Sequence, residues 1–262
     1  MASMAFMTRG SDVVATLRAA GCVFAEDEAQ LLIEAAHHPD QLSRMVDQRL
    51  SGLPLEHIVG WADFCGTRMS VDPGVFVPRR RTEFLVRMAA MIAQPGAVVV
   101  DLCCGSGAIG AALSDRLESS ELHAADIDPD AVHCARRNIE PRGGTVHQGD
   151  LYAALPLELR GKVDVLLANA PYVPTRAIEM MPQEARVHEP RLALDGGADG
   201  LVLQRRVALG AAGWLAPGGW LLMETSRHQA PGTARILGGA GLRVELASDE
   251  ELDATVVIGH RA

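Results

Sequence analysis

The sequence predicts an α/β fold, in which a mainly parallel, doubly wound sheet of seven strands follows a small helical domain. From Thr82 onward, short apolar and β-branched runs alternate with segments of helical periodicity, which is typical of parallel sheets covered by helices. Residues 12–50 show helical periodicity alone. The last two strand candidates are joined by residues 248–253, too short for a crossover helix, so this pair should be antiparallel.

The first domain, assigned to residues 1–52, should be helical. Its apolar residues recur at helical spacing in two runs, one of Val13, Val14 and Leu17 and one of Ala29, Leu32, Ile33 and Ala36. Gly21 and Pro39 should separate the helices. His37 and His38 precede Pro39, where a capping or cationic role is favoured over metal binding.

A linker, residues 53–81, should connect the two domains. Residues 53–80 are rich in Gly, Pro and aromatic residues, which predicts a short hairpin. The linker ends in Arg79, Arg80 and Arg81. These arginines either form salt bridges at the domain junction, which we favour, or face an acidic or RNA-bearing partner.

The third part, residues 82–262, should hold the sheet. Its strand candidates are residues 97–102, 121–126, 144–147, 163–168, 219–224, 242–247 and 254–260. Two further features of this third part concern the predicted active site. Glu224, at the end of a strand candidate, either reaches the active site or caps the next helix. The glycine-rich turn at 195–200 suits a movable lid.

A glycine-rich turn follows the first strand of the sheet. The order is Asp101, then Gly105 and Gly107, with no Lys-Ser or Lys-Thr after them, so a triphosphate loop is disfavoured. The glycines permit positive φ and close approach of a ligand. Asp126 ends the next strand, about 20 residues on, where a carboxylate can accept hydrogen bonds from both ribose hydroxyls. Asp101 would attract a cationic amino group, so the charges favour S-adenosylmethionine over a nicotinamide dinucleotide.

The strand at 163–168 ends in the tetrapeptide Asn169, Ala170, Pro171 and Tyr172. Ligands of parallel sheets bind beyond the carboxyl ends of the strands. The Asn169 side-chain oxygen and the Ala170 carbonyl could accept the two hydrogens of a planar nitrogen and direct it toward a methyl donor. Tyr172 would pack against the acceptor. The tetrapeptide therefore predicts methyl transfer to nitrogen, against the alternative of a plain strand-to-loop exit.

Nearly the whole chain resembles the class I S-adenosylmethionine-dependent methyltransferases, and within them the protein N5-glutamine methyltransferases that modify peptide release factors. The motifs that carry the resemblance are LPLEHIVGWADFCG (53–66), VDPGVFVPRRRTEFLV (71–86), DLCCGSGAIG (101–110), ADIDPDAV (125–132), GDLY (149–152), NAPY (169–172), LALDGGADGL (192–201) and APGGWLLMET (216–225). The resemblance implies a Rossmann-like methyltransferase sheet whose last strand is antiparallel.

The resemblance also implies roles for individual residues. Gly105 and Gly107 would line the methionine part of the cofactor, Asp150 and Leu151 would flank the adenine, and residues 169–172 would hold the substrate amide. The expected cofactor-binding set is Asp101, Cys103, Cys104, Gly105, Ser106, Gly107, Asp126, Asp150, Leu151 and Asn169, and the expected catalytic set is Asn169, Ala170, Pro171 and Tyr172. The helical domain would either help to recognise a protein substrate or merely cover the sheet edge.

Four departures from the family pattern leave the substrate open. Ala170 replaces a proline, Cys103 stands in place of a glycine, PRPET becomes residues 78–82 of this chain, and Glu-His-Gly becomes residues 224–226. We expect methylation of a release-factor glutamine, with S-adenosylhomocysteine as the product. The alternatives are another protein or a small-molecule amide or guanidine, N6-adenine methylation, and a non-catalytic cofactor-binding module.

Composition limits the other possibilities. The formal net charge is −9, which argues against a nucleic-acid binder. Five cysteines without a C-x-x-C pair and histidines without ligand spacing predict neither disulfides nor a metal. Adjacent Cys103 and Cys104 are interpreted as small loop residues. The segment MASMAFMTRG lacks a signal-peptide core, and no stretch suits a bilayer span, so we expect a cytoplasmic protein.

Overall fold

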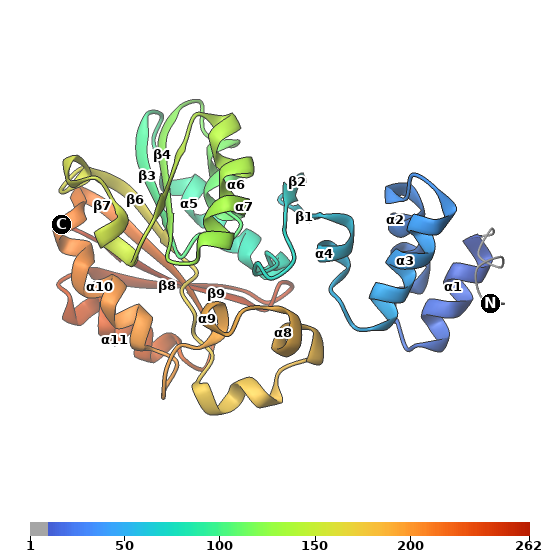
Figure 1. Ribbon diagram of the computed structural model, residues 1–262. Coiled ribbons are helices and arrows are strands. Elements are labelled where there is room, and N and C mark those ends of the chain that lie inside the picture. The colour runs from blue at the N-terminus through green and yellow to red at the C-terminus, as the bar shows by residue number, and fades with distance from the viewer. Residues whose placement is uncertain (1–9) are drawn as a thin grey trace.

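The computed structural model describes residues 10–262. Residues 1–9 of the segment MASMAFMTRG, in which we expected no signal peptide, lie outside the described residues. Three helices come first, α1 (Gly10–Ala19), α2 (Ala25–Ala35) and α3 (Pro39–Leu50), and they stand apart from the sheet in Figure 1. Their buried side chains form a separate apolar core. The ring of His38 accepts a hydrogen bond from the Gln41 amide at the start of α3, so the expected capping role is confirmed.

The segment between the helices and the sheet forms the expected hairpin, after a short helix that we did not anticipate. Helix α4 (Leu55–Val59) precedes strands β1 (Trp61–Phe64) and β2 (Thr67–Ser70), which pair antiparallel. The buried side chain of Asn138 ties the hairpin to the large domain: it accepts from the Ser70 amide and donates to the Ser70 carbonyl, both at 2.9 Å. The proposed domain boundaries after residues 52 and 81 remain predictions.

Seven strands build the main sheet. They are β3 (Ala97–Leu102), β4 (Ser120–Asp126), β5 (Thr145–Gln148), β6 (Val163–Ala168), β7 (Leu215–Thr225), β8 (Arg243–Asp249) and β9 (Ala254–His260). Their order is β5-β4-β3-β6-β7-β9-β8. The first five in this order are parallel, and β9 runs antiparallel to both β7 and β8. The predicted fold class is therefore confirmed. The strands predicted at 97–102, 163–168 and 254–260 have the predicted ends, and β7 begins four residues earlier than expected.

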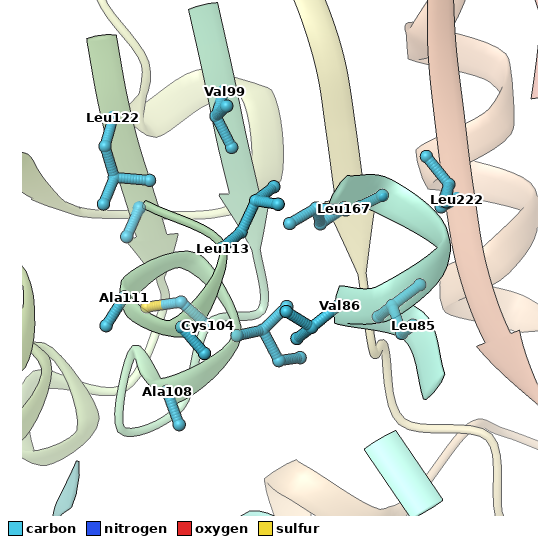
Figure 2. Close-up of a cluster of buried hydrophobic side chains, with 14 of the residues drawn as sticks. Leu85, Val86, Val99, Cys104, Ala108, Ala111, Leu113, Leu122, Leu167 and Leu222 are labelled. Carbon is cyan, nitrogen blue, oxygen red and sulfur yellow. The ribbon is translucent and has the colours of Figure 1, made fainter. Parts of the chain in front are cut away.

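Helices cover both faces of the sheet, because its strands bury alternate residues on opposite sides. One face packs against α5 (Glu83–Ile92), α6 (Ala108–Ser114) and α7 (Pro129–Ile139). Figure 2 shows part of this cluster, with Leu85 of α5 and Leu113 of α6 beside Leu167 of β6. The other face, which includes Leu166, packs against α10 (Val202–Trp214) and α11 (Ala230–Gly239).

The order in which strands are added to the sheet reverses at β3: β4 and β5 lie on one side of it, and β6 and β7 lie on the other. The connection after β3 therefore leads to one side of the sheet and the connection after β6 to the other. Such a switch point opens a crevice at the carboxyl ends of the strands, where ligands of α/β proteins bind. The glycine turn and the tetrapeptide are the segments that follow β3 and β6.

A further segment passes over this end of the sheet. It consists of η5 (Thr175–Met180), α8 (Gln183–His188) and α9 (Arg191–Leu194), which lie below the strand ends in Figure 1. Arg49 of α3 forms ion pairs with both Glu28 of α2 and Glu184 of α8. The helical domain is thus tied directly to the segment that covers the crevice.

Candidate active site

A cavity of about 230 Å³ lies at the carboxyl ends of β3, β4 and β6. Its walls come from the loops that follow these strands and β5, from the linker around residues 75–82, from residues 190–194 and from residues 203 and 206. The predicted site residues among its lining are Cys103, Cys104, Gly105, Ser106, Asp126, Asp150, Leu151, Asn169, Ala170, Pro171 and Tyr172. Asp101 and Gly107 do not line it. The fold thus brings together the cofactor and acceptor motifs that the sequence predicted.

The two glycines of the turn after β3, Gly105 and Gly107, differ in their surroundings. Gly105 has φ +55°, and a Cβ atom there would meet nothing within 4 Å, so this glycine borders open space. A Cβ at Gly107 would lie 2.9 Å from Ile139 and 3.1 Å from Ala135. Gly107 therefore allows the turn to pack against α7. Cys103 also has a positive φ, +56°, a conformation that costs a residue with a side chain about 1–2 kcal/mol.

Asp101 lies behind the turn, completely buried. Its Oδ2 accepts a hydrogen bond from the Gly110 amide at 2.9 Å, which fixes α6 to the end of β3. Its Oδ1 has no hydrogen-bond partner within the described residues. Burial raises the pKa of this carboxyl to about 7, although the Gly110 bond opposes the shift. Asp101 thus holds the start of α6 behind the turn. Because it does not line the cavity, a cationic group bound there would not contact it, contrary to our expectation.

Asp126 lies in the cavity wall, as expected. Its Oδ2 accepts from the Gly105 amide at 2.9 Å and its Oδ1 from the Asp128 amide at 3.0 Å. Each carboxylate oxygen can accept a second hydrogen bond, so the side chain can still bind a diol. The next residue, Ile127, also lines the cavity and is 48% exposed. Sequence reasoning missed it, although an apolar residue directly after an acidic strand end is a readable signal.

Asp150 and Leu151 form the neighbouring part of the wall. Asp150 pairs with Arg206 of α10, with 2.7 Å between Oδ2 and Nη2. Leu151 is buried and has a φ of +49°. Arg206 also lines the cavity, but it lies 56 residues further along the chain, where no local pattern marked it.

The backbone of the tetrapeptide is held firmly at the end of β6. The Tyr172 carbonyl accepts a hydrogen bond of 2.8 Å from Nε2 of Gln229. A Cβ at Gly196 would lie 2.7 Å from the Pro171 carbonyl, and one at Gly200 would lie 2.3 Å from the Tyr172 carbonyl. The glycines of the 195–200 turn are therefore required for close packing on the tetrapeptide. Whether the turn moves as a lid remains a prediction.

The side chains of the tetrapeptide reach two neighbouring elements. The Tyr172 hydroxyl lies 3.3 Å from Oε1 of Glu224 in β7 and accepts from Nη2 of Arg81 at 2.9 Å. Burial raises the pKa of Tyr172 to about 12, so the phenol stays protonated near neutral pH. The Asn169 amide nitrogen lies 3.5 Å from the hydroxyl of Thr82, which ends η1 (Arg80–Thr82). Ala170 is completely buried.

Glu224 and two of the three linker arginines form buried contacts. Glu224 is 2% exposed and contacts both Tyr172 and Arg81, so it reaches the site, which was one of the two expected roles. Arg79 pairs with the buried Glu189, at 2.6 Å from each carboxylate oxygen. Arg79 and Arg81 therefore form salt bridges, as we favoured, whereas their place at a domain junction remains a prediction.

Three further observations concern residues 10–262. This part of the chain contains no cluster of side chains that could hold a metal ion, and none of its helices has the length and apolarity of a membrane span. All five cysteines are free thiols. Burial and the nearby carboxylate of Asp126 raise the pKa of Cys103, so its thiol is protonated near neutral pH, in agreement with a loop-forming role.

Comparisons with known proteins agree with this geometry. The family model "Methyltransferase small domain" matches residues 67–212. The release factor glutamine methyltransferase of Geobacter sulfurreducens is 37% identical over 198 residues, covering 74% of this chain and 69% of its own. A 4-amino-L-phenylalanine/4-methylamino-L-phenylalanine methyltransferase of Streptomyces pristinaespiralis is 35% identical, covering 78% of this chain and 71% of its own.

A solved structure confirms the fold. The methyltransferase from Pyrococcus furiosus superposes with a TM-score of 0.58 at 16% identity, covering 75% of this chain and 90% of its own. The family model spans the turn after β3, Asp126 and the tetrapeptide, and the relatives extend over more than two thirds of both chains. This chain therefore belongs to the methyltransferase small domain family and, within it, to the release factor glutamine methyltransferases, which are S-adenosylmethionine-dependent enzymes.

Proposed function

We propose that this protein transfers a methyl group from S-adenosylmethionine to the side-chain amide nitrogen of the glutamine in the Gly-Gly-Gln loop of a peptide release factor. One observation carries the proposal: Asn169 and Ala170 line the same cavity as Gly105 and Asp126. The acceptor-binding motif and the cofactor-binding motif thus share one site. Membership of the release factor glutamine methyltransferases supports the identity of the acceptor.

The lining of the cavity fits the cofactor. A nucleoside with a free diol needs a carboxylate and an apolar face, and Asp126 and the half-exposed Ile127 supply them. The open backbone at Gly105 permits close approach of the amino acid part. We assign the ribose to Asp126, the adenine to Asp150 and Leu151, and the methionine part to the turn at 103–106. When bound, the cofactor supplies a methyl group on a cationic sulfur.

The residues of the chain would act on the acceptor mainly by orienting it. A glutamine nitrogen is a poor nucleophile because its lone pair is delocalised into the carbonyl. Two acceptors, Oδ1 of Asn169 and the carbonyl oxygen of Ala170, would bind its two hydrogens and stabilise positive charge as it develops. Tyr172, which is neutral, would pack against the amide. The methylated nitrogen then loses a proton to solvent, so positioning supplies most of the rate.

The replacement of proline by Ala170 is compatible with this role. The position contributes its carbonyl oxygen, which alanine retains, and what alanine lacks is the fixed φ of proline. Complete burial of Ala170 and the hydrogen bond from Gln229 to the Tyr172 carbonyl restrict the backbone in its place.

The test is methyl transfer to release factors, followed by peptide mass mapping. The purified protein is incubated with methyl-labelled S-adenosylmethionine and a full-length release factor, and in parallel with a release factor whose loop glutamine is replaced by alanine. We expect one methyl group on the loop glutamine and none on the variant. If the release factor stays unlabelled while the protein binds the cofactor, the proposed acceptor is wrong.

A second candidate acceptor is a small aromatic amine that carries a carboxylate. It is supported by the arginine at position 81, which lines the acceptor end of the cavity where the family motif has an acidic residue, and by the relative named for 4-amino-L-phenylalanine. The same assay with 4-amino-L-phenylalanine distinguishes the two acceptors. A nucleic-acid acceptor is disfavoured by the net charge of −9, and labelled DNA or RNA in the assay would contradict that view.

A further inference from the structure

The acceptor end of the cavity is bordered by three segments that are far apart in the sequence. They are residues 79–81 of the linker, residues 172–173 after β6, and residues 189–194, which end the segment that passes over the sheet. The members that line the cavity include Arg79, Arg81, Tyr172, Val173, Pro190 and Leu192. Asn169 and Ala170, which we assigned to the acceptor nitrogen, lie just before the second segment. An acceptor bound there would therefore lie beside all three.

Hydrogen bonds join the second segment to the other two. The Tyr172 hydroxyl accepts from Nη2 of Arg81 at 2.9 Å, which connects it to the linker. The Val173 amide donates to the Leu194 carbonyl at 3.0 Å, and the Val173 carbonyl accepts from the Gly196 amide at 2.8 Å. The second segment is thus attached on both sides.

An ion pair joins the two remaining segments, so that the three form a closed circuit. Nη2 of Arg79 lies 2.6 Å from each carboxylate oxygen of Glu189, and the Val77 amide donates to Oε1 of Glu189 at 3.1 Å. The Arg79 guanidinium also lies over the aromatic ring of Phe76, 4.9 Å from its centre, and Phe76 lines the cavity. We call the three segments, joined in this way, the rim.

The rim lies where the cavity meets the solvent. Leu192 is 55% exposed and the side chain of Arg81 is 44% exposed, although both residues line the cavity. The side chain of Glu189 is only 1% exposed, and that of Arg79 is 33% exposed. The contact that closes the rim is therefore largely shielded from water, and breaking it would leave a buried carboxylate without its cationic partner.

We propose that the rim is the entrance through which the acceptor reaches Asn169 and Ala170, and that Arg79 and Glu189 are positioning residues that hold its walls in place. Walls that move have to be ordered when the acceptor binds, and this ordering reduces the affinity. The ion pair orders them beforehand. This inference rests on the proposed function.

The cofactor end of the cavity is held by contacts that do not involve the rim. Asp126 accepts hydrogen bonds from two backbone amides, and Asp150 pairs with Arg206 of α10. Loss of the ion pair in the rim should therefore weaken binding of the acceptor and leave binding of the cofactor unchanged.

The test breaks this ion pair and, as a control, a similar pair elsewhere. Arg79→Met removes the charge and keeps an unbranched side chain, whereas Arg79→Lys keeps the charge. Arg142→Met breaks the pair of Arg142 with Asp115, which also has two contacts, each of 2.7 Å, and lies outside the cavity lining. We expect acceptor KM for the release factor to rise about tenfold or more in Arg79→Met, with cofactor Kd within about twofold of wild type.

The remaining variants show whether the effect belongs to the contact. Arg79→Lys should recover part of the acceptor affinity, and Arg142→Met should match wild type. The double variant of Arg79→Met with Glu189→Gln should lose no more than Arg79→Met alone, because both changes act on one contact.

Hydrogen–deuterium exchange of the free protein gives a readout that does not need turnover. The amides of residues 75–81 and 189–194 should exchange faster by about fivefold or more in Arg79→Met, and at the wild-type rate in Arg142→Met. Unchanged exchange in Arg79→Met would overturn the inference, whatever the acceptor.

The kinetic results can overturn it as well. An acceptor KM within about twofold of wild type in Arg79→Met would do so, as would an equal rise in Arg142→Met or a cofactor Kd that rises as much as the acceptor KM. A wild-type protein that binds the cofactor but does not methylate the release factor would refute the proposed function instead, and the exchange rates would still decide the inference.

Discussion

Replacing Gly200 with alanine should damage the acceptor site, because the new Cβ atom has no room. Gly200 has a φ of +75°, and a Cβ there would lie 2.3 Å from the Tyr172 carbonyl oxygen and 2.3 Å from Nε2 of Gln229. Non-bonded carbon contacts are optimal near about 3.5 Å, so the tetrapeptide or the turn has to move by about 1 Å. A displacement of this size at a reacting site can lower the rate by about 10²-fold.

Gly241 supplies the matched control, because it has a φ of +86° and a Cβ there would meet nothing within 4 Å. Both alanine variants carry the cost of a left-handed φ, about 1–2 kcal/mol, and only Gly200→Ala adds overpacking, about 1–3 kcal/mol. We expect urea denaturation to show Gly200→Ala less stable than Gly241→Ala by that second amount, and kcat to fall only in Gly200→Ala. Equal free energies of unfolding together with equal kcat values would refute the reasoning.

Two other predictions concern stability. Arg49→Met should lower the free energy of unfolding by about 3 kcal/mol, because it leaves the largely buried carboxylate of Glu28 unpaired. Arg18→Met, at an exposed pair, should change it by less than about 1 kcal/mol. Similar losses of the two variants in urea denaturation would contradict this. Asp101 has a folded-state pKa of about 7, above its ordinary 3.8, so its stabilising contribution is complete below 3.8 and is lost as the pH rises toward 7. Without cofactor, Asp101→Asn should therefore gain stability over wild type across this range, by up to about 1.4 kcal/mol per pH unit, and parallel stability–pH curves would count against it.

The sheet and the general location of the site could be predicted from the sequence. Runs such as residues 97–102 and 163–168 are apolar on both faces, as buried parallel strands are, and each ends in a conspicuous loop. Because strand ends of a parallel sheet gather at one edge, Asp126 and Asn169 were expected to be neighbours, and both line the cavity. The helix α4 was missed because five residues give too short a periodic signal.

The contacts that organise the acceptor end could not be predicted in the same way. Arg81 and Glu224 are 143 residues apart, and the sequence left two roles open for each of them. Thr82 was named only as the first residue of the alternating strands and helices, and its place beside Asn169 depends on how the linker crosses the sheet. Gly107 was assigned to the cofactor by the family resemblance, whereas its constraint in the structure is the close approach of α7, a tertiary contact.

The division of the cavity into a cofactor side and an acceptor side is the central claim, and two alanine variants test it most directly. Cofactor binding is measured by titration calorimetry, and methyl transfer to the release factor at saturating cofactor is measured with labelled methyl groups. Asn169→Ala should abolish transfer and leave cofactor Kd nearly unchanged, whereas Asp126→Ala should weaken the cofactor and retain transfer once the cofactor saturates. Transfer at the wild-type rate by Asn169→Ala would contradict the account.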